Sequence, residues 1–175
     1  MRGFTKLIDK MIAVQAEGAS MLMILLVIIM CTEVFLRYFL EAPTIWALEF
    51  TTFLYGMHFI LGYGYTEQFN GHVSVDILSS RLSRKLQDIL YVFTTVFISL
   101  PVCLLLCIWA YDNALLSTRT LEHSASAWGP SIWPVKLVMA VGFTFLVLQI
   151  SSNLIKRILQ LVHTGDPLNE VPHEP

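Results

Sequence analysis

Four long apolar runs constrain this chain more than any other feature. They cover about residues 19–38, 46–66, 88–112 and 132–155. The hydrocarbon core of a bilayer is about 30 Å thick, and a helix needs about 20 mostly apolar residues to cross it. Because the backbone must satisfy its own hydrogen bonds in lipid, runs of this length form helices. The sequence therefore predicts an all-α integral membrane protein with four transmembrane helices.

The composition supports a membrane protein and excludes two other classes. Apolar residues make up 55% of the 175 residues and charged residues only 14%, whereas an ordinary soluble domain has roughly 25% charged residues. So few charges cannot cover a soluble surface, and so much apolar sequence is incompatible with disorder. A net charge of −2 lacks the basic excess of nucleic-acid-binding proteins, so no nucleic-acid partner is expected.

The distribution of Lys and Arg predicts the orientation of the four helices. Eight of the eleven basic residues lie before the first apolar run, between the second and the third, or after the fourth. Basic residues concentrate on the cytoplasmic side of membrane proteins. We therefore expect both termini in the cytoplasm, and the segments around 41–45 and 112–131 on the outer side.

Two terminal segments lie outside the predicted spans. Residues 1–17 place apolar side chains on one helical face and charges on the rest, as in helices that lie in the membrane interface. We expect this helix to lie along the cytoplasmic surface before the chain turns into a four-helix domain over 18–157. Residues 158–175 are predicted to form a polar cytoplasmic tail.

The loop between the second and third runs carries three basic residues, Arg81, Arg84 and Lys85. Basic side chains next to a membrane attract anionic lipid head groups. One interpretation is that these three hold phospholipids in defined pockets, which makes phospholipids a predicted partner. The alternative is that they only anchor the loop to the membrane surface.

The charged residues near the outer ends of the spans include Glu33, Arg37, Glu49 and Lys136. Charges at this depth can reach the interface with their long side chains or pair one helical turn apart. A second hypothesis is that the four form one polar cluster between helices, since charges within a membrane are costly and often functional. Both interpretations stay open at the level of sequence.

The sequence offers no catalytic, metal-binding or cofactor-binding arrangement that we can recognise. His58 lies in the middle of a predicted span, but a bis-histidine haem would need a second histidine at the same depth, and the other four lie in loops or the tail. A hydrogen-bonded histidine is the preferred interpretation. The three cysteines, Cys31, Cys103 and Cys107, fall within predicted helices and are expected to be small apolar residues.

The order of short motifs around the four runs resembles the small membrane subunit, of the DctQ type, of tripartite ATP-independent periplasmic (TRAP) transporters. The resemblance covers about residues 20–155, and its most specific part is His-Val-Ser-Val-Asp after the second run. It departs from the family at Met139–Gly142, where many members have a proline before the glycine. The residues that carry it are Arg37, Tyr38, Trp46, Glu49, His72, Asp76, Glu122, Ser124, Pro130 and Trp133.

The resemblance implies a function that the residues alone do not reveal. The chain would be a non-catalytic scaffold for a large membrane subunit that moves as an elevator and holds the substrate and sodium sites. A periplasmic binding protein would deliver a carboxylate-type solute. The resemblance also implies a multi-pass protein in the cytoplasmic membrane of a bacterium or archaeon, with no cofactor on this chain.

The main alternative is a self-sufficient four-helix multidrug exporter that is coupled to protons through Glu33 or Glu49. Such exporters are shorter, their charge distribution is more even, and their glutamate lies deeper in the membrane. The eight-to-three distribution of basic residues and the outer position of both glutamates count against it. A b-type cytochrome, a third possibility, lacks the paired histidines.

Overall fold

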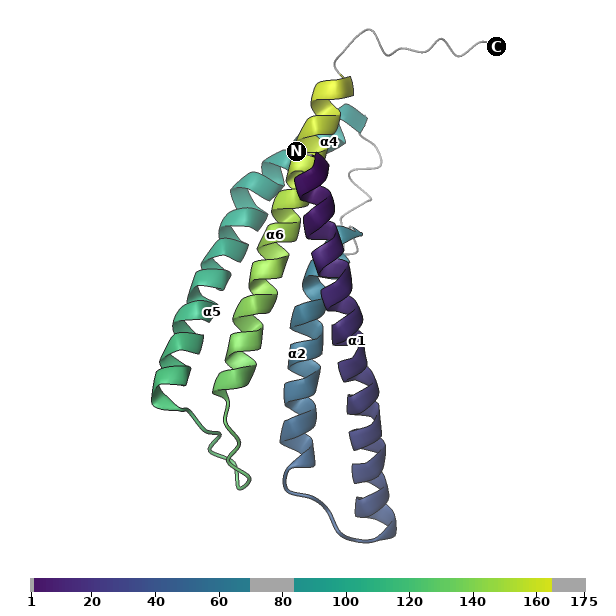
Figure 1. Ribbon diagram of the computed structural model, residues 1–175, viewed down its shortest axis with the longest axis vertical. Coiled ribbons are helices and arrows are strands. Elements are labelled where there is room, and N and C mark those ends of the chain that lie inside the picture. The colour runs from purple at the N-terminus through teal and green to yellow at the C-terminus, as the bar shows by residue number, and fades with distance from the viewer. Residues whose placement is uncertain (1, 70–83, 165–175) are drawn as a thin grey trace, which may run out of the picture.

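The computed structural model describes residues 2–69 and 84–164, and these are almost entirely helical (Figure 1). The only extended pairing within them is an isolated antiparallel bridge between His123 and Ser131. The all-α prediction is therefore confirmed for the described residues. The helices are α1 (Arg2–Phe39), α2 (Ala47–Gln68), α4 (Arg84–Thr94), η1 (Thr95–Ser99), α5 (Leu100–Thr120) and α6 (Trp133–Thr164).

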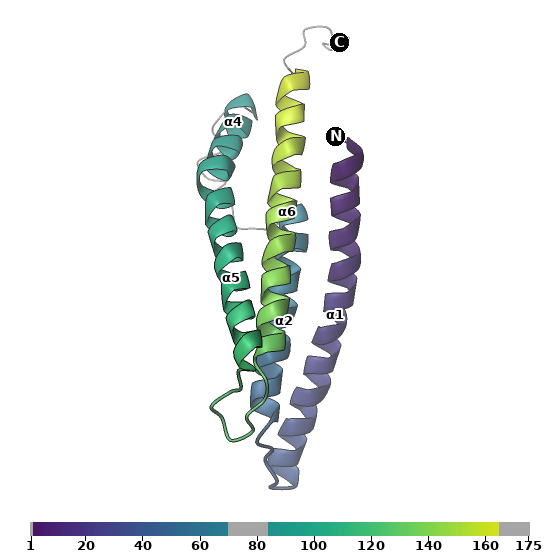
Figure 2. The same cartoon turned by 60° about the vertical axis from the view of Figure 1, so that its left-hand side comes forward.

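Helix α6 is the centre of the bundle. It packs against α2, α5 and α1, and α1 also packs against α2. Helix α5 flanks α6 on the side away from α1, so the helices form an open array and not a closed ring (Figures 1 and 2). The start of α1 and the end of α6 lie at the same end of the array (Figure 1). We call this the inner end, and the opposite end the outer end, after the orientation that the sequence predicts.

Three segments of the described residues are long and apolar enough to cross a membrane: Thr5–Phe39, Leu86–Thr120 and Trp133–Leu161. Helix α2 has 22 residues, which is sufficient length for a span, but it does not reach the same apolarity. Its sequence includes Glu49, His58 and three tyrosines. The structure thus gives three candidate spans where the sequence predicted four.

Helix α1 differs from the prediction at its inner half. The chain was expected to turn near residue 18, but α1 continues unbroken from Arg2 to Phe39. The reason is that part of the apolar face of the first turns is covered by protein: Ile8 and Ile12 are buried, whereas Leu7 and Met11 are exposed. An amphipathic pattern alone does not distinguish a helix packed on a bundle from a helix packed on a membrane surface.

The third helical segment is longer than predicted and contains a π turn. Residues 112–120, expected in the outer loop, are helical, and η1 joins α4 to α5 just before Pro101. Proline lacks the N–H that would pair with the carbonyl four residues earlier, so the regular bonding of the helix is interrupted where the i→i+5 bonds of the π turn occur. Helix α6 likewise continues to Thr164, so residues 158–164 of the predicted tail are helical.

Small residues allow the helices beside α6 to approach closely. Ala110 and Ala114 of α5 are fully buried with Ala140 of α6. On its other side, Gly142 of α6 lies against α2, where an added Cβ would contact the side chain of Ile60 and lie 3.0 Å from its carbonyl oxygen. Small residues at helix contacts are a general feature of membrane bundles.

Candidate functional site

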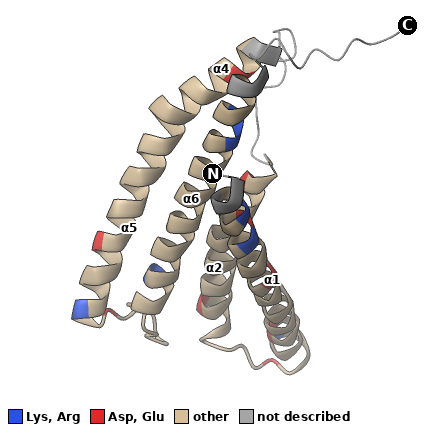
Figure 3. Cartoon of the chain, turned by 45° about the horizontal axis from the view of Figure 1, so that its top comes forward, with Lys and Arg blue, Asp and Glu red and all other residues tan. Residues whose placement is uncertain are grey.

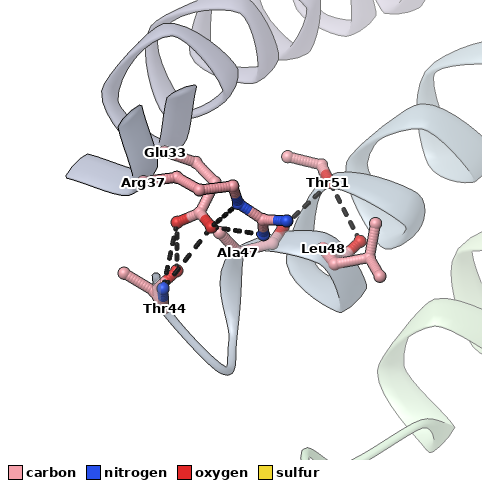
Figure 4. Close-up of polar contacts among 6 residues, drawn as sticks. All are labelled: Glu33, Arg37, Thr44, Ala47, Leu48 and Thr51. Atoms are coloured by element: carbon pink, nitrogen blue, oxygen red, sulfur yellow. Dashed lines mark hydrogen bonds and ion pairs between the residues drawn. The ribbon is translucent and has the colours of Figure 1, made fainter. Parts of the chain in front are cut away.

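The outer corner between α1 and α2 is held by Glu33, which is only 7% exposed. Its carboxylate accepts hydrogen bonds from Arg37 Nη2 at 2.7 Å and from Arg37 Nε at 3.3 Å. It also accepts a short bond from the Thr44 hydroxyl and weaker ones from the Thr44 backbone N–H (Figure 4). Because Thr44 belongs to the loop before α2, this carboxylate ties the end of α1 to the start of α2.

The outer loop between α5 and α6 is a short hairpin. Leu121 ends α5 in the left-handed region with φ 47°. The Ser124 N–H then donates to the Pro130 carbonyl at 2.8 Å, and the Ile132 N–H donates to the Glu122 carbonyl at 2.9 Å. Gly129, with φ 62°, makes the turn. These bonds give the loop a defined backbone shape at the outer face.

Two side-chain contacts fasten this hairpin to the bundle. The Glu122 carboxylate accepts from Lys136 Nζ at 2.5 Å, which ties the hairpin to the start of α6. The Ser126 hydroxyl donates to the Glu49 carboxylate at 2.5 Å, which ties it to the start of α2. The rings of Trp46, Phe50 and Trp128 pack beside that second contact, with centroids 6.1–6.5 Å apart.

The Glu122–Lys136 contact predicts a pH dependence. The hydrogen bond from Lys136 lowers the pKa of the Glu122 carboxyl below its ordinary value of 4.5. A lowered pKa in the folded state means that the carboxylate stabilises the fold above the unfolded-state pKa, and that this contribution is lost as the pH falls through the folded pKa. We expect the Tm of Glu122→Gln to lie below that of the natural chain at pH 7.

The comparison of the two chains between pH 7 and pH 3 checks this prediction. The difference in Tm should stay constant down to about pH 5 and then shrink as Glu122 becomes protonated. Glu41→Gln, an exposed glutamate in the other outer loop, is the control and should show no such difference. A gap between Glu122→Gln and the natural chain that persists at pH 3 would contradict the assignment.

The hypothesis of one four-charge cluster is not supported. Within the described residues, the contacts of Glu33 and Arg37 remain at the α1–α2 corner, Glu49 bonds to Ser126, and Lys136 bonds to Glu122. The residues therefore form three separate pairings along the outer rim. The i,i+4 pairing that the sequence indicated for Glu33 and Arg37 is confirmed.

The inner half of the bundle contains a polar network that the sequence analysis missed. Asp9 of α1 accepts from Lys156 Nζ of α6 at 2.7 and 2.8 Å. Gln149 Nε2 donates to the same carboxylate at 3.1 Å, and the Ser152 hydroxyl donates at 3.4 Å. Gln149 and Ser152 are fully buried. These contacts fix the inner half of α1 against α6.

The network continues from α6 to α2 through Asn153. Gln149 Nε2 also donates to Asn153 Oδ1 at 3.0 Å, and Asn153 Nδ2 donates to the Glu67 carbonyl at 2.7 Å. Burying a side-chain amide costs free energy unless the amide is hydrogen-bonded within the protein. Three helices are therefore tied together at one level. The signal in the sequence was the polar spacing 149, 152, 153 and 156, which marks one face of the fourth helix.

Two further contacts join α1 to α2. His58 Nδ1 lies 3.0 Å from the carbonyl oxygen of Ala19, so Nδ1 carries the proton. Gln15 Nε2 donates to the Leu61 carbonyl at 3.1 Å. The interpretation of His58 as a hydrogen-bonded histidine is confirmed. Figure 3 shows that charged residues lie mainly toward the helix ends. Both α1 and α6 carry basic residues near the inner end, and Arg37 and Lys136 lie near the outer end.

A protein-family model describes the chain: the DctQ component of tripartite ATP-independent periplasmic transporters, which matches residues 26–160. The chain belongs to this family. The matched segment includes all three outer pairings and the α6 half of the inner network, whereas Asp9 precedes it. As a DctQ component, the chain is part of a transporter and not an enzyme, and it is a multi-pass protein of the bacterial inner membrane.

One curated relative is the C4-dicarboxylate TRAP transporter small permease protein DctQ of Pseudomonas aeruginosa. It is 30% identical to this chain over 130 residues, which are 69% of this chain and 57% of the relative. The chain thus spans a little over half the length of that relative. Membership of the DctQ family replaces the alternative of a multidrug exporter, and the pairings of Glu33 and Glu49 agree with this.

Several predicted site residues are exposed, or fall outside the described part of this DctQ component. The Tyr38 side chain is 76% exposed, beyond the Glu33 corner. Trp133 is the first residue of α6. Arg84 and Lys85 begin α4, but their side chains are not among those described, so contact with lipid head groups stays a prediction. His72, Asp76 and Arg81 lie outside the described residues.

Proposed function

We propose that this DctQ component is a scaffold with four membrane spans and both termini in the cytoplasm. It would hold a large membrane subunit that carries out sodium-coupled import. This proposal rests on the contacts that hold the helices of the bundle together at both ends. Glu33 fixes α1 to α2 at the outer corner, and Asp9 fixes α1 to α6 at the inner end. A support must keep its shape while its partner moves.

Helix α2 would be the fourth span in this proposal. It lies between α1 and α6, and polar residues are tolerated in a span where protein covers them. Four passes also agree with the position of the start of α1 and the end of α6 on one side of the bundle and with the distribution of basic residues.

The proposed solute is a carboxylate that a periplasmic binding protein delivers. The relative from Pseudomonas aeruginosa carries C4-dicarboxylate in its name, which makes dicarboxylates the first solutes to test. The outer hairpin, held by Glu122 and Ser126, would lie on the face that such a binding protein approaches.

Reconstitution into proteoliposomes tests the proposal. We expect uptake of a labelled dicarboxylate only when this chain, the large membrane subunit and the binding protein are all present with an inward sodium gradient. The chain alone should give no uptake. Full-rate uptake by the large subunit and the binding protein without this chain would contradict the scaffold role, and uptake independent of sodium would contradict the coupling.

A further inference from the structure

Helix α2 presents a face that is poorly suited to lipid. The face is a single line of residues one helical turn apart, all exposed: Thr52, Tyr55, Gly56, Phe59 and Tyr63. We call these five residues the α2 face. Residues three and four apart share one side of a helix, so they form a continuous surface. Helix α2 is also the long helix that falls short of the apolarity of the three candidate spans.

Two phenol hydroxyls on the α2 face have no hydrogen-bond partner within the described residues. The Tyr55 side chain is 54% exposed and that of Tyr63 is 39% exposed. Tyr55 lies eight residues into α2, which is about 12 Å along the helix axis, so it lies well below the membrane surface if α2 spans the bilayer. A hydroxyl without a partner in hydrocarbon is unfavourable.

The α2 face also has room for close approach. An added Cβ at Gly56 would meet no atom within 4 Å, and the same holds for Gly62 beside the face. Glycines on a helix surface let the backbone of a second helix come near. The α2 face therefore suits contact with a helix that carries hydrogen-bonding groups. It suits contact with the acyl chains of lipid less well, because acyl chains offer no hydrogen bonds.

The exposed surface of α1 has a different character. Met21, Leu25 and Ile28 lie on the outside of α1, and all three are apolar, so acyl chains can cover them without an unsatisfied polar group. The outside of α5 is mixed, because the apolar Leu105 and Ile108 lie beside Trp109 and Asp112, which are also exposed. The contrast with the α2 face therefore holds for α1.

We propose that the α2 face receives a transmembrane helix of the large membrane subunit, and that this helix supplies hydrogen-bonding groups to Tyr55 and Tyr63. The inference rests on the proposed function, because it needs a large partner in the same membrane. It adds to that function by assigning the contact to one helix and one line of residues. The exposed apolar surface of α1 is then left for lipid.

A pair of glycine substitutions tests the inference. Gly56→Leu adds a bulky side chain on the α2 face, and Gly18→Leu adds the same side chain to α1, where an added Cβ also meets no atom within 4 Å. Both should leave the Tm of the isolated chain unchanged or raised. We expect Gly56→Leu to lower the amount of large subunit that co-purifies by about tenfold, the loss of one or two helix contacts. Gly18→Leu should co-purify as the natural chain does.

Photo-crosslinking supplies a second measurement that does not depend on a disruptive variant. A benzophenone amino acid at Phe59 should crosslink to the large subunit in the intact complex, whereas one at Leu105 of α5, 67% exposed, should not. Equal co-purification of the two glycine variants would overturn the inference. Crosslinks to the large subunit from Leu105 alone, or crosslinks from Phe59 to a second copy of this chain, would also overturn it.

The two proposals fail in different ways. If no large subunit co-purifies with the natural chain, the scaffold function itself is wrong. If it co-purifies but crosslinks elsewhere, only the assignment of the α2 face is wrong.

Discussion

Replacing Lys156 with methionine should lower the free energy of unfolding by about 2 kcal/mol. The change leaves the Asp9 carboxylate without its ion-pair partner, next to the buried Gln149 and Ser152. The estimate lies between the roughly 3–5 kcal/mol of a fully buried pair and the roughly 0–1 kcal/mol of an exposed one. The Asp9 and Lys156 side chains are 21% and 36% exposed, which places them between these limits.

The measurement is thermal unfolding of the purified chain in detergent. Lys10→Met is the matched control, since Lys10 is an exposed lysine of α1 near the same end of the bundle, and it should change the Tm little. The double exchange Asp9→Lys with Lys156→Asp should recover part of the lost stability. A Tm for Lys156→Met equal to that of the control would show that the inner network contributes nothing to stability.

Gly142→Ala should destabilise the contact between α2 and α6 by about 1–3 kcal/mol, because it overpacks a closed interface. The new Cβ would contact the side chain of Ile60 and approach its carbonyl oxygen to 3.0 Å, and a carbonyl in a regular helix cannot move away easily. Alanine normally stabilises a helix relative to glycine by up to about 1 kcal/mol. A net loss would therefore show that packing outweighs propensity at this position.

Gly18→Ala is the control for that experiment, because its Cβ would meet no atom within 4 Å. It should raise the Tm slightly by helix propensity alone. Both variants make the same chemical change, but only the Cβ at position 142 meets neighbouring atoms. We therefore expect the Tm to fall for Gly142→Ala and to rise slightly for Gly18→Ala. A stabilising effect at both positions would mean that α2 and α6 do not approach as closely as the structure indicates.

The sequence was sufficient for features that depend on local patterns. Long apolar runs placed the helices, and the spacing of Glu33 and Arg37 indicated their pairing, because both effects act within a few residues. The second run was predicted as a span from the same apolar pattern, but α2 is not among the three candidate spans. The inner half of α1 was assigned to the membrane surface. An amphipathic sequence has the same helical period whether lipid or protein covers its apolar face.

The side-chain contacts that hold the helices together could not be predicted, because the two residues of each contact are distant in sequence. Asp9 and Lys156 are 147 residues apart, and Glu49 and Ser126 are 77 apart. A charged residue on an amphipathic helix is usually solvated, so Asp9 gave no local reason to expect a partner. The outer charges were grouped by depth in the membrane, but depth does not determine which helix faces which.

The π turn before Pro101 has a consequence for the register of the whole third segment. A π turn holds one residue more than an α-helical turn of the same rise, and one residue corresponds to about 100° of rotation. The extra residue in η1 therefore sets the angle at which Ala110 and Ala114 meet α6. A chain one residue shorter between Thr95 and Ser99 could run as a plain α-helix and keep both ends in phase. The loss of one residue at this point would be tolerated by the packing, whereas a deletion within α5 before Ala110 would turn the alanines away from their partner.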